Sequence, residues 1–433
     1  MVNLPIEFSD KKVTPFGGMS LMKHFVDSLG IRDKLRALPL PQGQSNRAYD
    51  PVHIIESFWL SIWTGASRYI HADWLRYDTV LQSIFGFDSM PSQSTYSRFF
   101  NKFSDKLNTE IFPQLHNWMM DQVHIPEITL DLDSTVITRS GTQEGSAKGY
   151  NPLKRGRNSH HPLMAFIAQT RMVANAWVRP GNTADSSNCE AFLQETLHHA
   201  LAHQKVGLLR ADSGFYTQNI LNCLESEHIN YIIAARLYPT IKQRVYGLSD
   251  WVNVCSGIDV AEMQFAHEGG QQRRYIIVRK AVELRPKACG KFLFDDPAYR
   301  FSCYVTNLDL PLDQIWNLYN ARADCENRIK ELKQDFGLDQ FCMQDFWATE
   351  ASFRFIMIAY NIMSLFRFFA LQSHKKSTLK TLRSYCFALG AWTVNHSNKT
   401  VLKISLPTKK RAWMTGIFAS IQQNPPPFSF SNA

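Results

Sequence analysis

The sequence predicts an α/β protein in which helical regions flank a central sheet, and three observations support this fold class. The first 125 residues carry apolar side chains at helical spacing. From residue 127 onward, short apolar runs typical of strands alternate with helical segments. After about residue 346 the pattern is helical again. A chain of 433 residues is long for a single core, so two or three domains are expected.

The N-terminal region, residues 1–125, is predicted to be helical. The run PVHIIESFWLSIWTGAS (51–67) has helix-period apolar positions, and Pro51 suits a first helical turn. After the turn-like stretch Gly86–Pro91, the segment SQSTYSRFFNKF (92–103) predicts a short helix with Ser or Thr as its cap.

Residues 126–237 carry the strand pattern. Glu127–Asp133 alternates apolar and polar positions, and Val206–Asp212 is a short apolar run typical of a buried central strand. The other predicted elements are an antiparallel pair of strands, two helices and a further strand: His161–Gln169, Met172–Arg179, Asp185–His203, 217–227 and Asn230–Arg236. Three strands followed by alternating helices and strands match the ribonuclease-H-like fold, which is therefore the predicted catalytic core.

Two segments follow in the predicted organisation. Residues 238–309 are β-rich and punctuated by glycine, which indicates an inserted β subdomain. Residues 310–345 contain one long helix, from about 312 to 336, that stops at Gly337.

Residues 346–433 are predicted to form a helical region that is basic near its end and finishes in a loose tail, NPPPFSFSNA. The most apolar stretch, Phe353–Leu371, contains Arg354, Asn361 and Arg367. A bilayer core penalises such side chains, so a buried helix is expected there and no membrane partner.

Composition narrows the partners and the compartment. Lys and Arg total 47 against 38 for Asp and Glu, and this charge of +9 favours DNA, RNA or an anionic membrane as partner. The eight cysteines include no CxxC pair, and the N-terminus has no charged segment followed by an apolar one. Reduced thiols, a cytoplasmic location and no zinc site are therefore expected.

Two aspartates are predicted to meet at one edge of the sheet. Asp133 ends the first predicted strand and Asp212 ends the fourth. Ligands gather where strands of open α/β sheets end, and a divalent cation would relieve the repulsion between two carboxylates. Asp131 shares a strand face with Asp133 and is the alternative first carboxylate, although a structural role is preferred for it.

The long predicted helix brings four polar residues together. Tyr319, Arg322, Glu326 and Lys333 have offsets of 0, 3, 7 and 14. At helical geometry they fall within an arc of roughly 60° and extend over roughly 21 Å. They either face the carboxylates and a substrate or form an ordinary solvated flank.

The spacing Tyr-x2-Arg-x3-Glu-x6-Lys resembles the signature of bacterial insertion-sequence transposases of the Asp-Asp-Glu class. The surroundings LDLDST, GYNPLKRGR, RPGNTAD and RADSGFY are also similar to that group. The likeness is to the insertion-sequence-1380 branch; it covers most of the chain and is weakest in the first 50 residues.

The resemblance implies a role for each matching residue. Asp133, Asp212 and Glu326 would be catalytic and would hold two Mg²⁺ ions, for which Mn²⁺ substitutes. Asp133 is chosen over Asp131 because the group's first aspartate directly precedes a small residue and Thr. Arg322 and Lys333 would hold DNA phosphates, and Tyr319 would contact the same backbone.

The helical N-terminal region, residues 1–125, is expected to bind DNA, and two segments of the chain are further candidates for contact with it. Lys154 and Arg157 belong to a basic loop that either meets the DNA backbone or is simply solvated. The helix over 92–103 carries Arg98 and Lys102, and it is either a recognition helix or an ordinary amphipathic helix.

The implied activity is transposition: binding of terminal inverted repeats, Mg²⁺-dependent strand cleavage and transfer to target DNA, by cut-and-paste through a hairpin. Pairing of two ends implies a homodimer on DNA, associated with the bacterial nucleoid. A nuclease that never joins DNA and a DNA-binding module that has lost its chemistry are the rival interpretations. Retention of all three carboxylates argues against the second rival.

Overall fold

The computed structural model describes residues 4–183, 187–266, 270–281, 299–371, 377–397 and 399–430. The start of the helix predicted over 185–203 and residues 282–298 of the predicted insertion lie outside them. The contacts divide the chain into two compact units, residues 1–124 with 331–429 and residues 125–330 with 430–433. The sequence pattern contains no sign that the N- and C-terminal segments share a unit.

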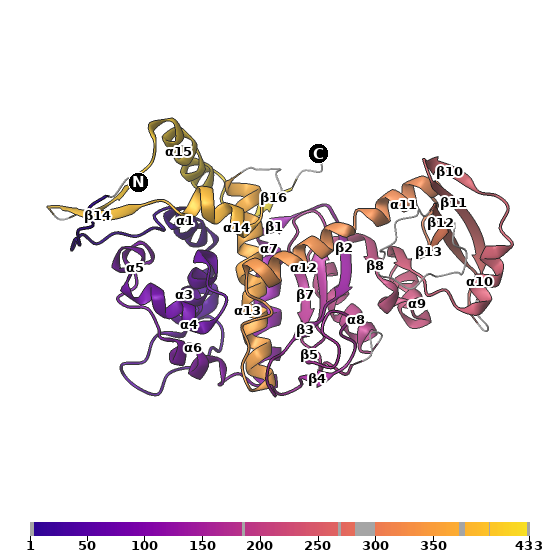
Figure 1. Cartoon of the computed structure of the whole chain (residues 1–433), viewed down its shortest axis with the longest axis horizontal. Helices are drawn as coiled ribbons and strands as arrows, with labels where there is room; N and C mark the ends of the chain where they lie inside the picture. The colour runs from indigo at the N-terminus through magenta and orange to yellow at the C-terminus, as the bar shows by residue number, and fades with distance from the viewer. Residues whose placement is uncertain are drawn as a thin grey trace. The chain divides into compact units, whose positions relative to one another are not determined.

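The first unit is mainly helical (Figure 1). Its N-terminal elements are α1 Met19–Leu29, α2 Ile31–Arg36, α3 Pro51–Thr64, α4 Tyr69–Ala72, the 3-10 turn Asp73–Tyr77, α5 Thr79–Phe85, α6 Gln93–Phe100, α7 Asp105–Asp121 and β1 Val123–His124. Its C-terminal elements are α13 Phe346–Leu365, a π-helical turn Phe366–Ala370, α14 Leu379–Leu382, a second π turn Arg383–Phe387, β14 Ala391–His396, β15 Lys399–Ile404, α15 Thr408–Gln423 and β16 Phe428–Ser429. The helices predicted over 51–67 and 92–103 are confirmed as α3 and α6.

Helix α13 forms the centre of this unit. Of its 20 residues 17 are buried, and the indole nitrogens of Trp59 and Trp63 on α3 donate to the carbonyls of Phe355 and Ala359, at 2.9 and 3.2 Å. The span Phe346–Ala370 is long and apolar enough to cross a membrane, but 83% of its most apolar segment is buried inside the protein. The prediction of a buried helix is confirmed.

The C-terminal region differs from the prediction at two places. β14 and β15 form an antiparallel hairpin beyond residue 390, and α15 follows it. The predicted loose tail is wrong up to residue 429, because β16 pairs in parallel with β1 and Phe428 is buried, its ring stacked on those of Phe25 and Phe369.

The second unit is built on a nine-stranded mixed sheet in the order β7-β6-β2-β8-β9-β13-β12-β11-β10. The strands are β2 Glu127–Ser134, β6 Leu163–Ile167, β7 Val173–Trp177, β8 Lys205–Ala211, β9 Asn230–Ala234, β10 Val252–Cys255, β11 Ile258–Phe265, β12 Arg273–Ala281 and β13 Tyr299–Thr306. The helices are α8 Cys189–Leu201, the 3-10 turn Ser213–Phe215, α9 Gln218–Ser226, α10 Pro239–Tyr246 and α11 Leu312–Asn320. A small separate sheet contains β3 Ile137–Thr138, β4 Ala147–Lys148 and β5 Asn158–His160.

All five strands predicted between residues 127 and 236 are present. β2, β6 and β7 are antiparallel neighbours, and β2, β8 and β9 run parallel. The predicted insertion differs from a separate subdomain, because β13 pairs with β9 and its four strands therefore extend the same sheet. It also contains α10, a helix that the β-rich pattern did not indicate.

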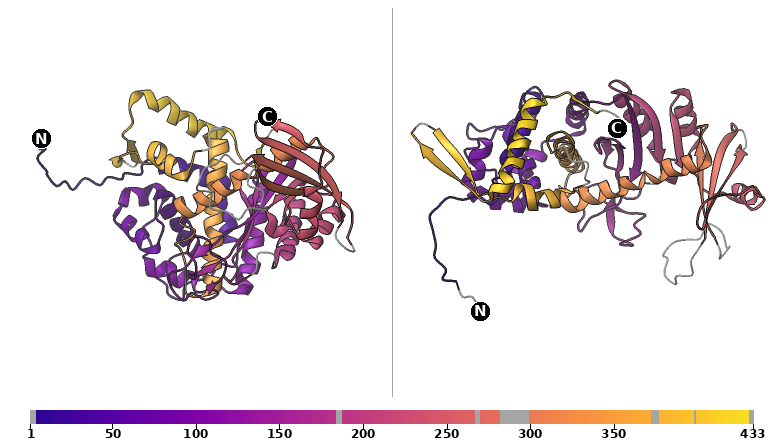
Figure 2. Two further views of the ribbon diagram at one scale, coloured as in Figure 1. Left: turned by 45° about the vertical axis from the view of Figure 1, so that its right-hand side comes forward. Right: turned by 90° about the horizontal axis from the view of Figure 1, so that it is seen from above.

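Two helices, rather than the single one predicted over 312–336, follow the sheet. α11 ends at Asn320, and α12 runs from Ala323 to Asp335. Ile315 anchors α11 in a cluster with Ile232, Val260 and Ile276 of the sheet. Figure 2 (right) shows α11 and the first turns of α12 along one face of the strands. The predicted stop at Gly337 is confirmed by its left-handed backbone, φ +67°.

Candidate active site

Asp133 and Asp212 lie side by side at the ends of two neighbouring strands. β2 and β8 pair in parallel with Leu132 opposite Ala211, so the next position on each chain is an aspartate. Paired strands lie about 4.8 Å apart. The register therefore brings these two backbones together at one edge of the sheet.

The two aspartates also share a face of the sheet. One pleat earlier, Asp131 lies opposite Arg210, and their side chains form a two-pronged ion pair at 2.7 and 3.0 Å. Side chains two residues apart on a strand point the same way. The backbone at Asp212 is still extended, with φ −79° and ψ 179°, so Asp133 and Asp212 follow Asp131 and Arg210 onto that face.

Arg322 meets Asp133 from the turn between α11 and α12. Its Nη2 is 3.2 Å from Oδ2 of Asp133 and donates to the carbonyl of Leu132 at 2.9 Å. The side chain is buried, with 6% of the residue exposed. Arg322 therefore supplies a positive charge to Asp133 in this structure.

The surroundings of Asp133 disfavour the ionised form of its carboxyl group. Burial raises the pKa of Asp133, Arg322 lowers it, and the charges of Asp212 and Glu326 raise it again, to about 6. Asp133 therefore lies within electrostatic reach of both Asp212 and Glu326.

Glu326 lies on α12 one turn beyond Arg322 and is exposed, so it does not point into the apolar interior. Carboxylate oxygens are the ligands that Mg²⁺ prefers, and the aspartate pair fits such an ion in its donor chemistry. Within the described residues, however, no three His, Cys, Asp or Glu side chains are gathered closely enough to hold a metal. Joint coordination by all three carboxylates would require the Glu326 side chain to move toward the aspartates.

The common arc predicted for Tyr319, Arg322, Glu326 and Lys333 depends on one continuous helix, and the structure divides that helix between the first residue and the last two. Tyr319 belongs to α11, Arg322 to the turn, and Glu326 and Lys333 to α12. Arg322 is buried whereas Glu326 is exposed, and the charges of both act on the pKa of Asp133. The common arc itself stays a prediction.

Tyr319 packs beside the aspartate edge of the sheet. Its ring centroid is 4.2 Å from that of Tyr304, and its hydroxyl donates to the carbonyl of Ala211 at 3.5 Å. Burial raises its pKa, so the phenol stays neutral. Lys154 and Arg157 are exposed in the loop between β4 and β5, and Lys333 is half-buried on α12.

Asp131 is a structural residue, as preferred from the sequence. It is fully buried, and beyond its pairing with Arg210 it lies 3.8 Å from Nη1 of Arg328 on α12. Arg328 also donates to the carbonyls of Ile167 and Ala168, and Arg210 to that of Leu318. These buried arginines fix α11 and the start of α12 on the sheet.

Sequence reasoning missed Arg210 and Arg328. For Arg210 the sequence did offer a signal, an arginine inside the apolar run of a predicted central strand, because a buried arginine needs a partner.

The arrangement defines a class of protein: an α/β protein with a pair of aspartates where two neighbouring parallel strands end. The profile of the family described as "Transposase DDE domain group 1" matches residues 2–426. The chain belongs to this family and is a DNA-cleaving transposase enzyme.

The chain is also similar to a solved structure, the piggyBac transposase synaptic complex with hairpin DNA studied by cryo-EM. The sequence identity is 14%, the TM-score is 0.47, and the match covers 87% of this chain and 81% of the other. No curated protein matches the chain.

Proposed function

We propose that this transposase binds the terminal inverted repeats of its own insertion sequence and carries out Mg²⁺-dependent strand cleavage and strand transfer. The route is cut-and-paste through a hairpin, and two copies of the chain act on paired ends. The observation that carries the proposal is the register of β2 and β8, which gives Asp133 and Asp212 one edge and one face of the sheet.

The order β7-β6-β2-β8-β9 supports a ribonuclease-H-like core for this activity. Its first three strands are antiparallel in chain sequence and the next two run parallel to the first, which is the order expected of that fold. The Tyr-Arg-Glu-Lys signature and the likeness to the insertion-sequence-1380 branch are consistent with it.

In this proposal Asp133, Asp212 and Glu326 hold the metal. Bound Mg²⁺ would supply activation of the attacking oxygen and stabilisation of the leaving one. Before metal and DNA bind, Arg322 neutralises the charge of Asp133. Once they are bound, its guanidinium contacts a DNA phosphate, which is the role that the resemblance implies.

Four further residues are proposed to contact DNA. Tyr319 contacts the DNA backbone next to Asp212. Lys333 and Lys154 bind phosphates through their single ammonium charges, and Arg157 binds a phosphate through its forked guanidinium. Mn²⁺ is expected to replace Mg²⁺ because it accepts the same oxygen ligands.

The proposal is tested with the DNA that flanks the gene for this chain. The protein is incubated with this DNA and Mg²⁺, nicks and hairpins are mapped, and pre-cleaved ends are offered with a target duplex. Cleavage at the inverted repeats followed by joining to the target supports transposition. Cleavage without any joining would instead identify a nuclease.

Metal binding is expected to depend on pH through Asp133. Because its pKa in the metal-free protein is about 6, the carboxyl is protonated below that pH and must lose its proton to bind a cation. The affinity for Mn²⁺ should be constant above pH 7 and fall by about tenfold per pH unit below 6. Calorimetric titration of the metal-free protein between pH 5 and 8 measures this, and equal affinities at pH 5 and 7 would contradict it.

A further inference from the structure

A basic hollow of about 580 Å³ lies in the first unit, between α6 and the segment that precedes α3. Its charged side chains are Arg47, Arg98 and Lys102, and its polar ones include Gln44 and Thr95. None of the described residues that line it is acidic. All the charged side chains that line this basic hollow are therefore positive.

Helix α6 is held so that Arg98 faces outward. Tyr96, Phe99 and Phe100 are buried, and the hydroxyl of Tyr96 donates to Oγ of Ser57 on α3 at 3.0 Å. Arg98 lies on the opposite, exposed side. Because the aromatic side chains fix the rotation of α6, the guanidinium stays at the surface.

The two walls of the basic hollow are tied together. Nζ of Lys102, just beyond α6, donates to the carbonyl of Gln42 at 2.7 Å. Arg47 belongs to the segment that follows Gln42, and it lines the same hollow as Arg98.

Arg47 and Arg98 have no carboxylate partner within the described residues, in contrast to three other arginines of the unit. Arg32 pairs with Glu56, Arg36 with Asp33 and Arg354 with Glu350. Two arginines that face one concave space without a counterion are available to an external anion.

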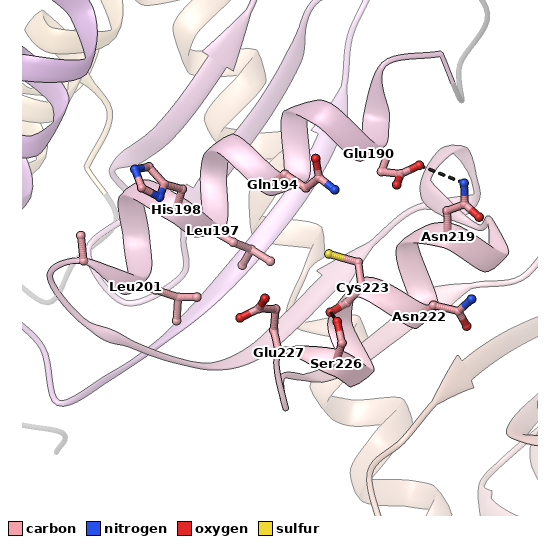
Figure 3. Close-up of a pocket in the computed structure, with 11 residues that line it drawn as sticks. Glu190, Gln194, Leu197, His198, Leu201, Asn219, Asn222, Cys223, Ser226 and Glu227 are labelled. Carbon is pink, nitrogen blue, oxygen red and sulfur yellow. Dashed lines mark hydrogen bonds between the residues drawn. The ribbon is translucent and has the colours of Figure 1, made fainter.

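A second hollow differs from the basic hollow in the charge of its lining. It has a volume of about 1070 Å³ and lies between α8 and α9 in the other unit (Figure 3). Glu190 and Glu227 line it together with the apolar Leu197, and Glu190 accepts a hydrogen bond from Asn219 at 3.0 Å. These carboxylates would repel a phosphate.

We infer that the basic hollow binds backbone phosphates of duplex DNA without reading base sequence. The inference rests on the proposed function and names one of its DNA contacts outside the catalytic edge. A helix that reads bases must enter the major groove as a ridge, whereas Arg98 and Lys102 line a concave wall that accepts a projecting phosphate. The structure thus favours a positioning role for α6 over a recognition helix.

The test is a binding titration of the full chain on two fluorescent duplexes of equal length, one with the terminal inverted repeat and one with a scrambled sequence. The variants are Arg98→Ala and Arg47→Ala, and Arg98→Lys preserves the charge. Arg36→Ala is the matched control, because Arg36 is an exposed helical arginine of the same unit outside the basic hollow. Circular dichroism verifies that each variant is folded.

Each lost phosphate contact reduces the magnitude of the slope of log affinity against log salt concentration by about 0.9. The loss of affinity in each alanine variant, relative to the wild type, should therefore be about eightfold larger at 0.1 M salt than at 1 M salt. The loss should be equal for both duplexes. Arg98→Lys and Arg36→Ala should keep the wild-type slope.

Two results would overturn the inference. A loss confined to the inverted-repeat duplex would make α6 a base reader, and wild-type slopes in both alanine variants would show that the basic hollow does not touch DNA. If cleavage of the ends still requires Asp133 in that second case, the proposed function survives without the inference. If binding depends on the basic hollow but no cleavage occurs at the ends, the proposed function fails and the inference stands.

Discussion

Asp133→Asn and Asp212→Asn are each expected to reduce DNA cleavage by at least about a thousandfold while leaving binding of the ends unchanged. Asparagine keeps the shape of aspartate but removes the negative charge that a cation requires. The strand register is held by backbone pairing and by the Asp131–Arg210 ion pair, so the fold should tolerate both changes.

Single-turnover cleavage of an inverted-repeat duplex in Mg²⁺ measures this effect, and a gel shift in the presence of a chelator measures binding. Asp313→Asn is the matched control, because Asp313 is an exposed carboxylate on α11 in the same unit. A wild-type rate in Asp133→Asn or in Asp212→Asn would remove that residue from the active site.

Asp131→Ala should act on stability, although Asp131 is only two residues from Asp133. Removal of this carboxylate leaves Arg210 buried without its ion-pair partner and removes a charge facing Arg328. Breaking such a buried pair costs about 3–5 kcal/mol. Amides of β2 and β8 should therefore exchange with solvent about two to four orders of magnitude faster, as measured by hydrogen exchange.

A second variant separates the ion pair from simple loss of volume. Asp131→Leu combined with Arg210→Met replaces the pair by apolar side chains, and such replacements are often neutral or better. The double variant should regain part of the lost protection against hydrogen exchange. The recovery should be incomplete, because Arg210→Met also removes the hydrogen bond from Arg210 to the carbonyl of Leu318. If protection against hydrogen exchange in Asp131→Ala equals that of the wild type, the ion pair does not contribute to the stability of the sheet.

The strands around the aspartates were predictable because their signal is local. Glu127–Asp133 and Val206–Asp212 carry alternating or continuous apolar runs, and the structure has β2 and β8 there. The pairing of β16 with β1 was not predictable, since it joins segments some 300 residues apart and neither is longer than two residues. The joining of β13 to β9 likewise depends on tertiary contacts and has no signature in the sequence.

The break between α11 and α12 shows a different limit. The residues NARAD (320–324) contain no glycine or proline, so helical spacing continues through them. The interruption coincides with tertiary bonds on either side, from Arg210 to the carbonyl of Leu318 and from Arg322 to that of Leu132. A periodicity argument ignores these bonds and therefore predicts one uninterrupted helix.

The most direct test of the account is crystallography of the transposase bound to an inverted-repeat duplex in Mn²⁺, with anomalous scattering used to locate the metal. The account predicts a peak at coordination distance from Asp133 and Asp212, with Glu326 turned toward it and Arg322 released from Asp133. Manganese bound elsewhere, with these two aspartates still held by Arg322, would contradict it.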